Sequence, residues 1–374
     1  MSIFMSRDVK LYVSGISSQV WEIPVLEGYS FSQSTNTAEV TLSEATGATG
    51  VSRRGRKMFN NSLAPVEFSF STYARPFKGT AAYAKAAGDT DNDIHAVEEI
   101  LWGLLLGANT WTAGDMKRGS SAVSTSDGTD LNIEFTQSNV PTLASGVVLT
   151  FVIPNESGSG VMAYEINGAA FNEASIDFDI EGIATINWSG MGTTITEGSA
   201  PTTTIDEKIT STSNFIQNRL STLSLTASAS ESILGSYNLV LTGGNITVSN
   251  NLTFLTPEEL GVVNKPIGHV TGTRSVSGSL TCYLDDAAAG SADLFEDLTL
   301  STGKITNEFD LTVNVGGTTS ATPRLRFQCN HSHFQIPQHS FDDVVSVEAT
   351  FDALPQFIDG TDECSIAYFP FFGI

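Results

Sequence analysis

Segments from the first half of this chain recur, in the same order, in its second half. The matching pieces are Val25-Leu26-Glu27-Gly28 with Val240-Leu241-Thr242-Gly243, Ser34 with Ser249, Asn36 with Asn251, Asn167 with Asn330, Phe171 with Phe334, Phe178 with Phe341, Asp179 with Asp342, and Trp188 with Phe351. A period of this kind indicates that one structural unit is folded twice. A ring of n chains would then contain 2n similar units, which suits a closed cyclic assembly.

The order of the expected elements is the same in both halves. Each half is expected to hold two strands joined by a long loop, then a helix, then about three strands. The first helix is predicted from an apolar stripe at helical spacing between Ile94 and Leu105, with Asp91 and Asp93 at its start and Gly107 at its end. The second helix is predicted over Ser291–Leu300, which has the same character.

Strands account for most of the remaining chain. They are predicted at Leu11–Pro24, Gly28–Leu42, Val66–Arg75, Val147–Ile153, Val161–Gly168, Glu173–Trp188, Leu220–Ala229, Tyr237–Val248, His269–Leu284, Glu308–Val315, Pro323–Asn330 and Val344–Phe351. The 33 glycines and the frequent Ser and Thr favour short strands with many turns. We therefore expect a mainly β fold made of two tandem β-sandwich or half-barrel domains, each with one flanking α-helix. The first domain is predicted over residues 1–195, a linker over 196–212 and the second domain over 213–374.

The composition excludes several classes of protein. Asp and Glu total 41 against 18 Lys and Arg, a net charge of −23, so the chain is not expected to bind DNA by neutralising phosphates. The three cysteines are too few and too unevenly spaced for a disulfide framework. The N-terminus lacks the apolar core of a signal peptide, and the longest apolar runs are too short to cross a membrane. We expect a soluble protein made in a reducing cytoplasm.

Signals for catalysis or for a metal are thin. Cys329, His331 and His333 alternate along one predicted strand, but they lack the paired spacing of zinc ligands. The chain has no serine nucleophile elbow and no phosphate-binding glycine loop. We predict that it is not an enzyme and that it needs neither a cofactor nor a metal.

Ordered motifs along nearly the whole chain resemble the major tail tube proteins of long-tailed bacteriophages of the T-five type. The motifs are Arg53-Arg54-Gly55-Arg56-Lys57-Met58-Phe59-Asn60-Asn61-Ser62-Leu63, Glu67-Phe68-Ser69-Phe70-Ser71-Thr72-Tyr73, Ile180-Glu181-Gly182-Ile183, Asn187-Trp188-Ser189-Gly190, Asn250-Asn251-Leu252-Thr253-Phe254-Leu255-Thr256-Pro257 and Gly278-Ser279-Leu280-Thr281-Cys282-Tyr283-Leu284. The similarity runs from about residue 7 to about residue 360. Each piece is weak alone, and their order makes the resemblance specific.

The resemblance implies two tail-tube-type domains per chain and three chains per ring with pseudo-sixfold symmetry. The inner strands would join into one continuous β-barrel through which the genomic DNA passes without specific binding. Rings would stack into a non-contractile tail of the virion, assembled in the cytoplasm of the bacterial host. The implied partners are further copies of the chain, a tape measure protein, and the tail terminator and tail-tip proteins. No insertion of this chain into a membrane is expected.

In each half, acidic residues alternate with apolar residues along a predicted strand near the end of that half. We predict that they line the wall of the tube and repel DNA over about 8–10 Å at physiological salt. The candidates are Glu173, Asp177, Asp179, Glu181, Asp342, Glu348 and Asp352. In a monomeric sandwich, the same pattern would describe only a solvated sheet face.

The run from Arg53 to Lys57 is the only basic cluster of the sequence. We predict that Arg53, Arg54, Arg56 and Lys57 form a loop that reaches an acidic neighbouring subunit and helps rings to stack. A solvated loop and a nucleic-acid patch are the alternatives, although no aromatic platform accompanies the patch. For the chain as a whole, the alternative function is a tail-tip or receptor-binding protein or a capsid decoration protein.

Overall fold

The structure is a computed structural model of the whole chain. It describes residues 4–16, 19–40, 57–78, 94–106, 124–126, 130–133, 135, 146–155, 160–201, 214–227, 235–300, 308–318, 322–341, 343–358 and 360–370. The predicted fold class is confirmed at the level of a mainly β protein, with two short α-helices among the described residues.

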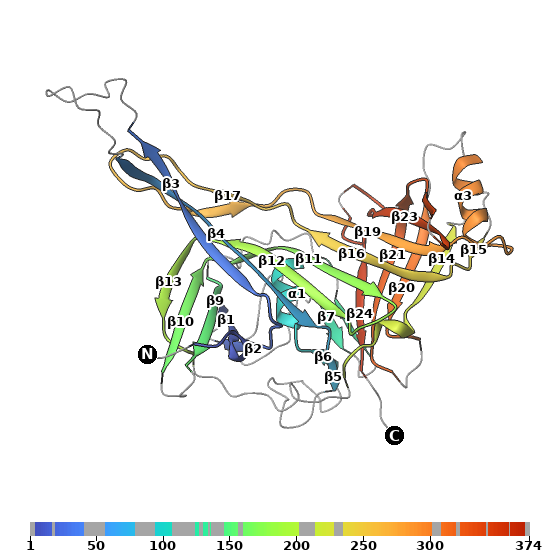
Figure 1. Cartoon of the computed structure of the whole chain (residues 1–374), viewed down its shortest axis with the longest axis horizontal. Helices are drawn as coiled ribbons and strands as arrows, with labels where there is room; N and C mark the ends of the chain where they lie inside the picture. Colours follow the sequence, from blue (N-terminus) through green and yellow to red (C-terminus); the bar gives the residue numbers. More distant parts are fainter. Residues whose placement is uncertain are drawn as a thin grey trace.

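One long antiparallel sheet runs across the molecule and includes strands from both halves (Figure 1). Its strand order is β15 (Ser236–Tyr237), β14 (Thr222–Ala227), β20 (Phe309–Val315), β21 (Arg324–Phe334), β23 (Val345–Ala353), β19 (Ser275–Tyr283), β16 (Leu241–Ser249), β11 (Ala170–Asp179), β12 (Thr185–Gly192), β4 (Met58–Tyr73) and β3 (Ser30–Glu39). Strand β22 (Gln338–Phe341) adds to β23, and β24 (Ser365–Phe369) adds to β21. The first and second halves meet where β11 pairs with β16.

A second sheet of five strands packs against the first-half part of the long sheet (Figure 1). Its order is β13 (Thr194–Gly198), β10 (Val161–Asn167), β9 (Val148–Pro154), β1 (Lys10–Ile16) and β2 (Gln19–Ile23). Phe151 of β9 makes the contact, because its ring centroid lies 4.8 Å from Phe31 and 6.4 Å from Phe70. Residues alternate between the two faces of each strand, so the inward-facing ones form a shared core.

Short helices and hairpins complete the fold. The α-helices are α1 (Glu99–Leu106) and α3 (Ser291–Leu300), and the 3₁₀ turns are η1 (Ser6–Asp8) and η3 (Asn218–Leu220). The small strands are β5 (Pro76–Lys78), β6 (Ile94–Ala96), β7 (Ser124–Ser126), β8 (Leu131–Ile133), β17 (Thr253–Leu255) and β18 (Gly268–Val270). Every residue of α1 is buried, and its Trp102 packs edge-on against Trp188 of β12 at 4.9 Å. Among the described residues, no helix has the length and apolar character needed to cross a membrane.

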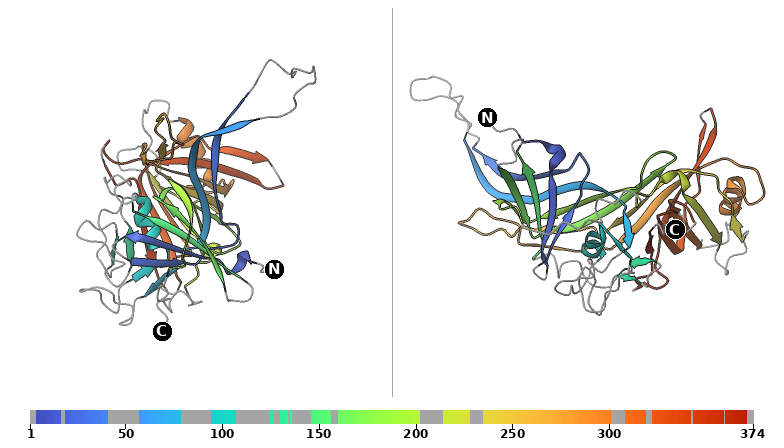
Figure 2. Two further views of the ribbon diagram at one scale, coloured as in Figure 1. Left: turned by 90° about the vertical axis from the view of Figure 1, so that its left-hand side faces the viewer. Right: turned by 90° about the horizontal axis from the view of Figure 1, so that it is seen from below.

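Two hairpins extend away from the body as an arm (Figures 1 and 2). One is the outer part of β3 and β4, and the other carries β17 and β18. Backbone hydrogen bonds join them, because Leu63 N donates to Asn264 O at 2.8 Å and Asn264 N donates to Asn61 O at 3.2 Å. The arm is therefore made by both halves of the chain.

A buried polar cluster also links the halves. Glu98, just before α1, accepts a hydrogen bond from the backbone N of Arg75 at 3.2 Å. Glu98 also bonds to Tyr368 of β24, and Tyr368 accepts a 2.7 Å hydrogen bond from Trp102 Nε1. Burial raises the pKa of Glu98 to about 7, although the nearby guanidinium of Arg75 opposes this shift.

The structure corrects several sequence predictions. The helix starts at Glu99, so Ile94 and Val97 are not helical, and Ile94 lies in β6. Asp91, Asp93 and Gly107 lie outside the described residues. Leu11–Pro24 holds two paired strands instead of one, and so does Glu173–Trp188. Residues 196–198 of the expected linker belong to β13, which pairs with β10.

Candidate functional site: the open face of the long sheet

One face of the long sheet covers the core, and the other, here called the open face, is polar. Along β11, Ile176 and Phe178 are buried, whereas Asp177 and Asp179 are exposed. Strand alternation places the exposed side chains on a single face. The prediction of one acidic and one apolar face is therefore confirmed for this strand.

Strand β23 has the same alternation. Ala349 and Phe351 are buried, whereas Glu348, Thr350 and Asp352 are exposed. Strands β16 and β19 separate β23 from β11, and direct partners across these strands share a face. The carboxylates of both halves therefore lie on the same side of one continuous sheet.

Hydroxyl and amide side chains fill the space between the acids. Ser71 Oγ donates to Asn187 Oδ1 at 2.7 Å, and Asn187 Nδ2 donates to Asp177 Oδ2 at 3.3 Å. Ser71 of β4 and Asn187 of β12 are direct partners in one row, and Asp177 of β11 lies in the neighbouring row, where its direct partner is Thr185. Sequence reasoning missed this polar lattice, although the alternating Ser and Asn of β4 and β12 are its signal.

The acids are spread out across the rows. Asp179 and Glu348 share a row through Gly243 and Thr281, so three strand spacings separate them. At about 4.8 Å per strand this is about 14 Å, which exceeds the screening length of about 8–10 Å. Acids of the two halves are thus well separated in this row, whereas Asp177 and Asp179 lie only about 7 Å apart along β11. Within the described part of the chain, no group of three or more His, Cys, Asp or Glu could hold a metal ion.

The predicted wall residues differ in their positions. Glu173 is half-buried on β11, Asp177 and Asp179 are exposed on β11, Glu181 is exposed in the turn after it, Glu348 and Asp352 are exposed on β23, and Asp342 lies outside the described residues. Glu181 leaves the strand because Gly182 adopts a φ of +117° in the turn. The structure therefore brings five of these residues onto the sheet face.

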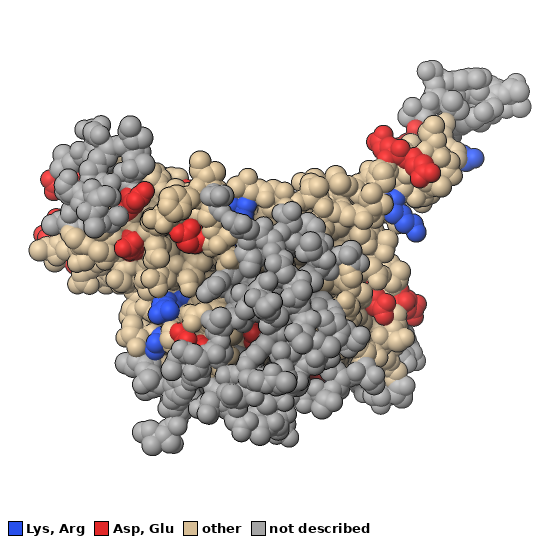
Figure 3. Space-filling model, turned by 180° about the vertical axis from the view of Figure 1, so that it is seen from behind, with Lys and Arg blue, Asp and Glu red and all other residues tan. Residues whose placement is uncertain are grey.

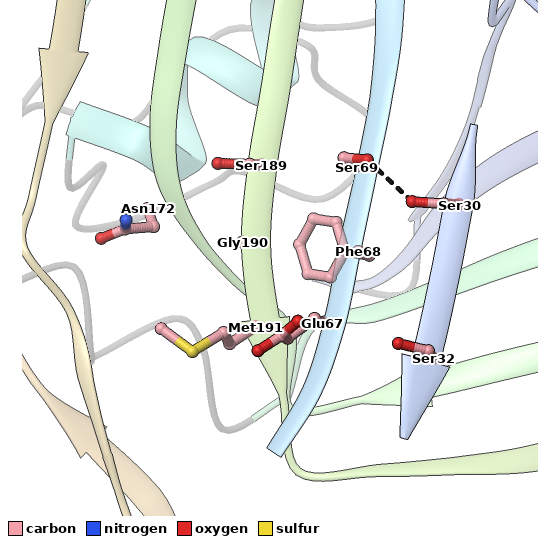
Figure 4. Close-up of a pocket in the computed structure, with 9 residues that line it drawn as sticks. All are labelled: Ser30, Ser32, Glu67, Phe68, Ser69, Asn172, Ser189, Gly190 and Met191. Carbon is pink, nitrogen blue, oxygen red and sulfur yellow. Dashed lines mark hydrogen bonds between the residues drawn. The ribbon is translucent and has the colours of Figure 1, made fainter. Parts of the chain in front are cut away.

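A hollow of about 340 Å³ lies over β3, β4 and β12 (Figure 4). Ser30 and Ser69 line it, with their Oγ atoms 2.9 Å apart, and Glu67 lies opposite Met191. The remaining lining residues are Ser32, Phe68, Asn172, Ser189 and Gly190. Small hydroxyls and one carboxylate offer a ligand few strong contacts. We therefore interpret the hollow as part of a polar surface and not as a ligand site.

Of the predicted basic loop, only Lys57 belongs to the described part of the chain. Arg53, Arg54 and Arg56 lie outside the described residues, and Lys57 is exposed at the start of β4. Lys57 Nζ lies 5.2 Å from the ring centroid of Phe59. On the face shown in Figure 3, acidic side chains and a smaller number of basic ones are scattered over the arm, the body and the opposite end.

The weak metal candidates are paired with protein groups. His333 lies opposite Asp352 across β21 and β23, and His331 Nδ1 is 3.9 Å from Glu308 Oε2. Cys329 is buried and faces the core, away from both histidines. Regular alternation would put all three on one face, but the β20–β21 ladder shifts register between Cys329 and Ser332, and this irregularity reverses the faces.

Comparison with known proteins identifies the family. The profile of the phage tail tube protein family matches residues 101–353, which is more than half of the chain. The chain belongs to the phage tail tube protein family. It is 29% identical over 376 residues to tail tube protein pb6 of Escherichia phage T5, an alignment that covers 97% of this chain and 75% of the relative.

Membership confirms the resemblance inferred from the sequence. The protein is a structural subunit of a phage tail tube, a component of the virion, and it is not an enzyme. As a tail tube protein it assembles with copies of itself. Neither comparison names a receptor-binding or capsid protein.

Proposed function

We propose that three of these tail tube chains close into a ring by pairing β22 of one chain with β3 of the next, and that stacked rings form an acidic-lined conduit for DNA. The ring wall would be the eight-strand path β3–β4–β12–β11–β16–β19–β23–β22 of each chain. Its open face would line the lumen. The proposal includes the tandem duplication and the division into two domains, with the boundary after the end of β13 at Gly198.

The strand orders of the two halves support the duplication. The inner path splits into β3–β4–β12–β11 and β16–β19–β23–β22. The outer strands follow β2–β1–β9–β10–β13 in the first half and β15–β14–β20–β21–β24 in the second. Each position in one order has a counterpart at the same place in the other, and α1 and α3 each precede the third outer strand.

The joint between the halves supports the mode of closure. In the repeat, β16 corresponds to β3, and β22 corresponds to β11. The β11–β16 joint within one chain is therefore a template for a joint between β22 of one chain and β3 of the next. Phe178 on β11 is 3% exposed, with its ring over Gly244 of β16. Its repeat partner Phe341 on the free edge β22 is 81% exposed. The same side chain is thus covered at the internal joint and uncovered at the chain's edge.

The wall chemistry supports the conduit. Six to ten Lys or Arg contacts to phosphate would hold DNA with dissociation constants on the order of 10⁻⁴ to 10⁻⁶ M. The strands of the open face carry hydroxyls, amides and spaced carboxylates instead. Duplex DNA carries one negative charge per about 1.7 Å of axis, so such a wall repels it weakly at close range. We keep the tape measure, terminator and tip proteins as expected partners, and Arg53–Lys57 as the expected stacking loop.

A cysteine pair tests the closure. The internal joint pairs Asp177 with Asn245, and the repeat places Ser340 opposite Ser30 of the next chain. We expect the double variant S30C/S340C, oxidised after assembly, to yield covalent rings that run as trimers without reductant. The variant S30C/S346C is the control, because Ser346 lies one strand further in. Assembled tubes in which the two double variants cross-link equally would overturn the proposed joint.

Electron microscopy of the concentrated protein tests the assembly itself. Hollow stacked rings of uniform width are expected. Discrete particles that stay unstacked when the tape measure and initiator proteins are added would contradict the tube.

A further inference from the structure

The strand β24 ties the two halves of the chain together. It pairs with β21 of the second half on one side and with β8 of the first half on the other. Its Tyr368 also accepts the hydrogen bond from Trp102 of α1. Contacts that fix the position of β24 therefore also fix the first and second halves relative to each other.

Two cysteines face each other at the start of this strand. The β21–β24 ladder pairs Gln328 with Ser365, and the same register sets Cys329 opposite Cys364. The two thiols lie close enough to affect each other's ionisation, and Cys364 Sγ also donates to the backbone O of Ser365 at 3.6 Å. Both residues are buried, at 1% and 3% exposure, and both are free thiols.

This geometry suits a disulfide. Directly opposed residues of antiparallel strands have Cα atoms about 4.5–5.5 Å apart, within the range of about 4.4–6.8 Å that a disulfide spans. Rotation about the Cα–Cβ bonds can therefore bring the two sulfurs within bonding reach. Cys282 offers no such partner, because it lies between Leu241 and Val347 in the long sheet.

We propose that Cys329 and Cys364 are a latent cross-link, which closes after the tail leaves the reducing cytoplasm of its host. Disulfides persist in oxidising surroundings, and a virion component passes into them. A peroxide oxidises one thiol to a sulfenic acid and is reduced to water. The sulfur of the second thiol then attacks the sulfenic sulfur, the S–S bond forms, and a second water leaves.

The cross-link is expected to close slowly. The thiolate is the reactive form of cysteine. The neighbouring Cys329 thiol and burial raise the pKa of the Cys364 thiol well above its ordinary value. Closure therefore belongs to ageing of the released tail and not to its assembly. Once closed, the bond would fasten β24 to β21 and stabilise the fold by restricting the unfolded chain.

Peptide mapping of the full chain tests the proposal. Protein purified under reductant is divided, and one part is treated with hydrogen peroxide before the remaining thiols are alkylated and the chain is digested without reductant. We expect a linked Cys329–Cys364 peptide only in the oxidised sample, with Cys282 alkylated in both. The unfolding midpoint should rise by about 5 °C on oxidation.

Matched variants give a second readout. The rise in the midpoint should persist in C282S and vanish in C364S, or in C329S if C364S does not fold. Three alkylatable cysteines after peroxide treatment would overturn the proposal. Sulfinic or sulfonic acids in place of the linkage, or links that involve Cys282 equally, would also overturn it.

Discussion

At the scale of single residues, glycines on the long sheet lie opposite phenylalanines of neighbouring strands. The pairs are Gly190 with Phe68, Gly244 with Phe178, and Gly278 with Phe351. In each pair the ring fills the space that a glycine side chain would take. Adjacent strands approach closely there, and the rings extend the core over the gap.

Gly190 tests this arrangement. A Cβ at this position would lie 2.5 Å from Phe68 Cζ and 2.3 Å from Ala170 O, so the backbone itself is in the way. We expect Gly190→Ala to lower the free energy of unfolding by about 1–3 kcal/mol, measured by urea denaturation. Gly268→Ala is the control, because nothing lies within 4 Å of its added Cβ. Equal stability of the two variants would argue against the close approach.

Glu98 gives the fold a dependence on pH. Its pKa is raised from 4.5 to about 7, so the folded chain keeps a proton that the unfolded chain releases. This contribution to the free energy of unfolding is complete below about pH 4.5 and is lost as the pH rises to about 7. The groups facing Glu98 are Arg75 and Tyr368, with Glu99 beside them.

Glu98→Gln cannot lose that proton. We expect the stability of this variant relative to the natural chain to increase by about 3 kcal/mol between pH 4.5 and pH 7.5, measured by urea denaturation at several pH values. Glu197→Gln, at an exposed position of β13, should show no such change. A parallel pH profile for E98Q and the natural chain would contradict a raised pKa.

At the scale of elements, the arm is held by few contacts. Asn264 makes two backbone bonds to β4, and its side chain also closes its own loop, with Oδ1 accepting from Glu259 N at 2.9 Å. Beyond Asn264, residues such as Leu260 and Ile267 are 100% and 71% exposed. The arm therefore owes its order to hydrogen bonds more than to a core.

Asn264→Ala should loosen the arm without unfolding the body. We expect amide hydrogen exchange over residues 256–267 to rise about tenfold or more, while the unfolding midpoint moves by less than about 2 °C. Lys265→Ala, at the exposed next position, is the control. Unchanged exchange in N264A would show that the side chain does not order the loop.

The elements also show how far the sequence predicts this fold. The bounds of α3 are predicted correctly, because Leu294 and Leu298 mark one buried stripe. The stripe beginning at Ile94 misleads, since strand β6 supplies its first buried residue and the helix follows. The outer part of β4 lies in the arm, outside the core. Its side chains do not alternate between buried and exposed, so the sequence pattern does not predict this part of the strand.

The candidate site is likewise only partly predictable from the sequence. Alternation predicts the exposed acids Asp177 and Asp352, because it is local and follows the strand period. That these acids share one continuous sheet depends on the pairing of β11 with β16, about 70 residues away in the chain. Such a contact leaves no periodic trace in either strand. In the sequence, only the internal repeat indicates that β11 and β16 pair.

At the scale of the whole molecule, the charge of the proposed wall can be reversed. We expect Asp177→Lys combined with Asp352→Lys to give assembled tubes that retain DNA at low salt and release it as salt increases, because each phosphate contact releases a counterion. Retention is measured by co-sedimentation of tubes with short duplex DNA. Glu197→Lys combined with Asp310→Lys is the matched control, since both residues are exposed on outer strands. Equal retention by the two double variants would remove Asp177 and Asp352 from the wall.

The two halves are parts of one polypeptide, and this connection has a consequence for the kinetics of assembly. In the proposed ring, every second joint is the β11–β16 joint, which forms within one chain. Tethering converts that step from an encounter of two molecules into an intramolecular event, at an effective concentration in the millimolar range for a short linker. A ring of six similar units then needs two encounters between molecules instead of five, followed in either case by closure of the ring. Fewer partial rings with exposed edges accumulate, and growth becomes easier to confine to an existing tube end.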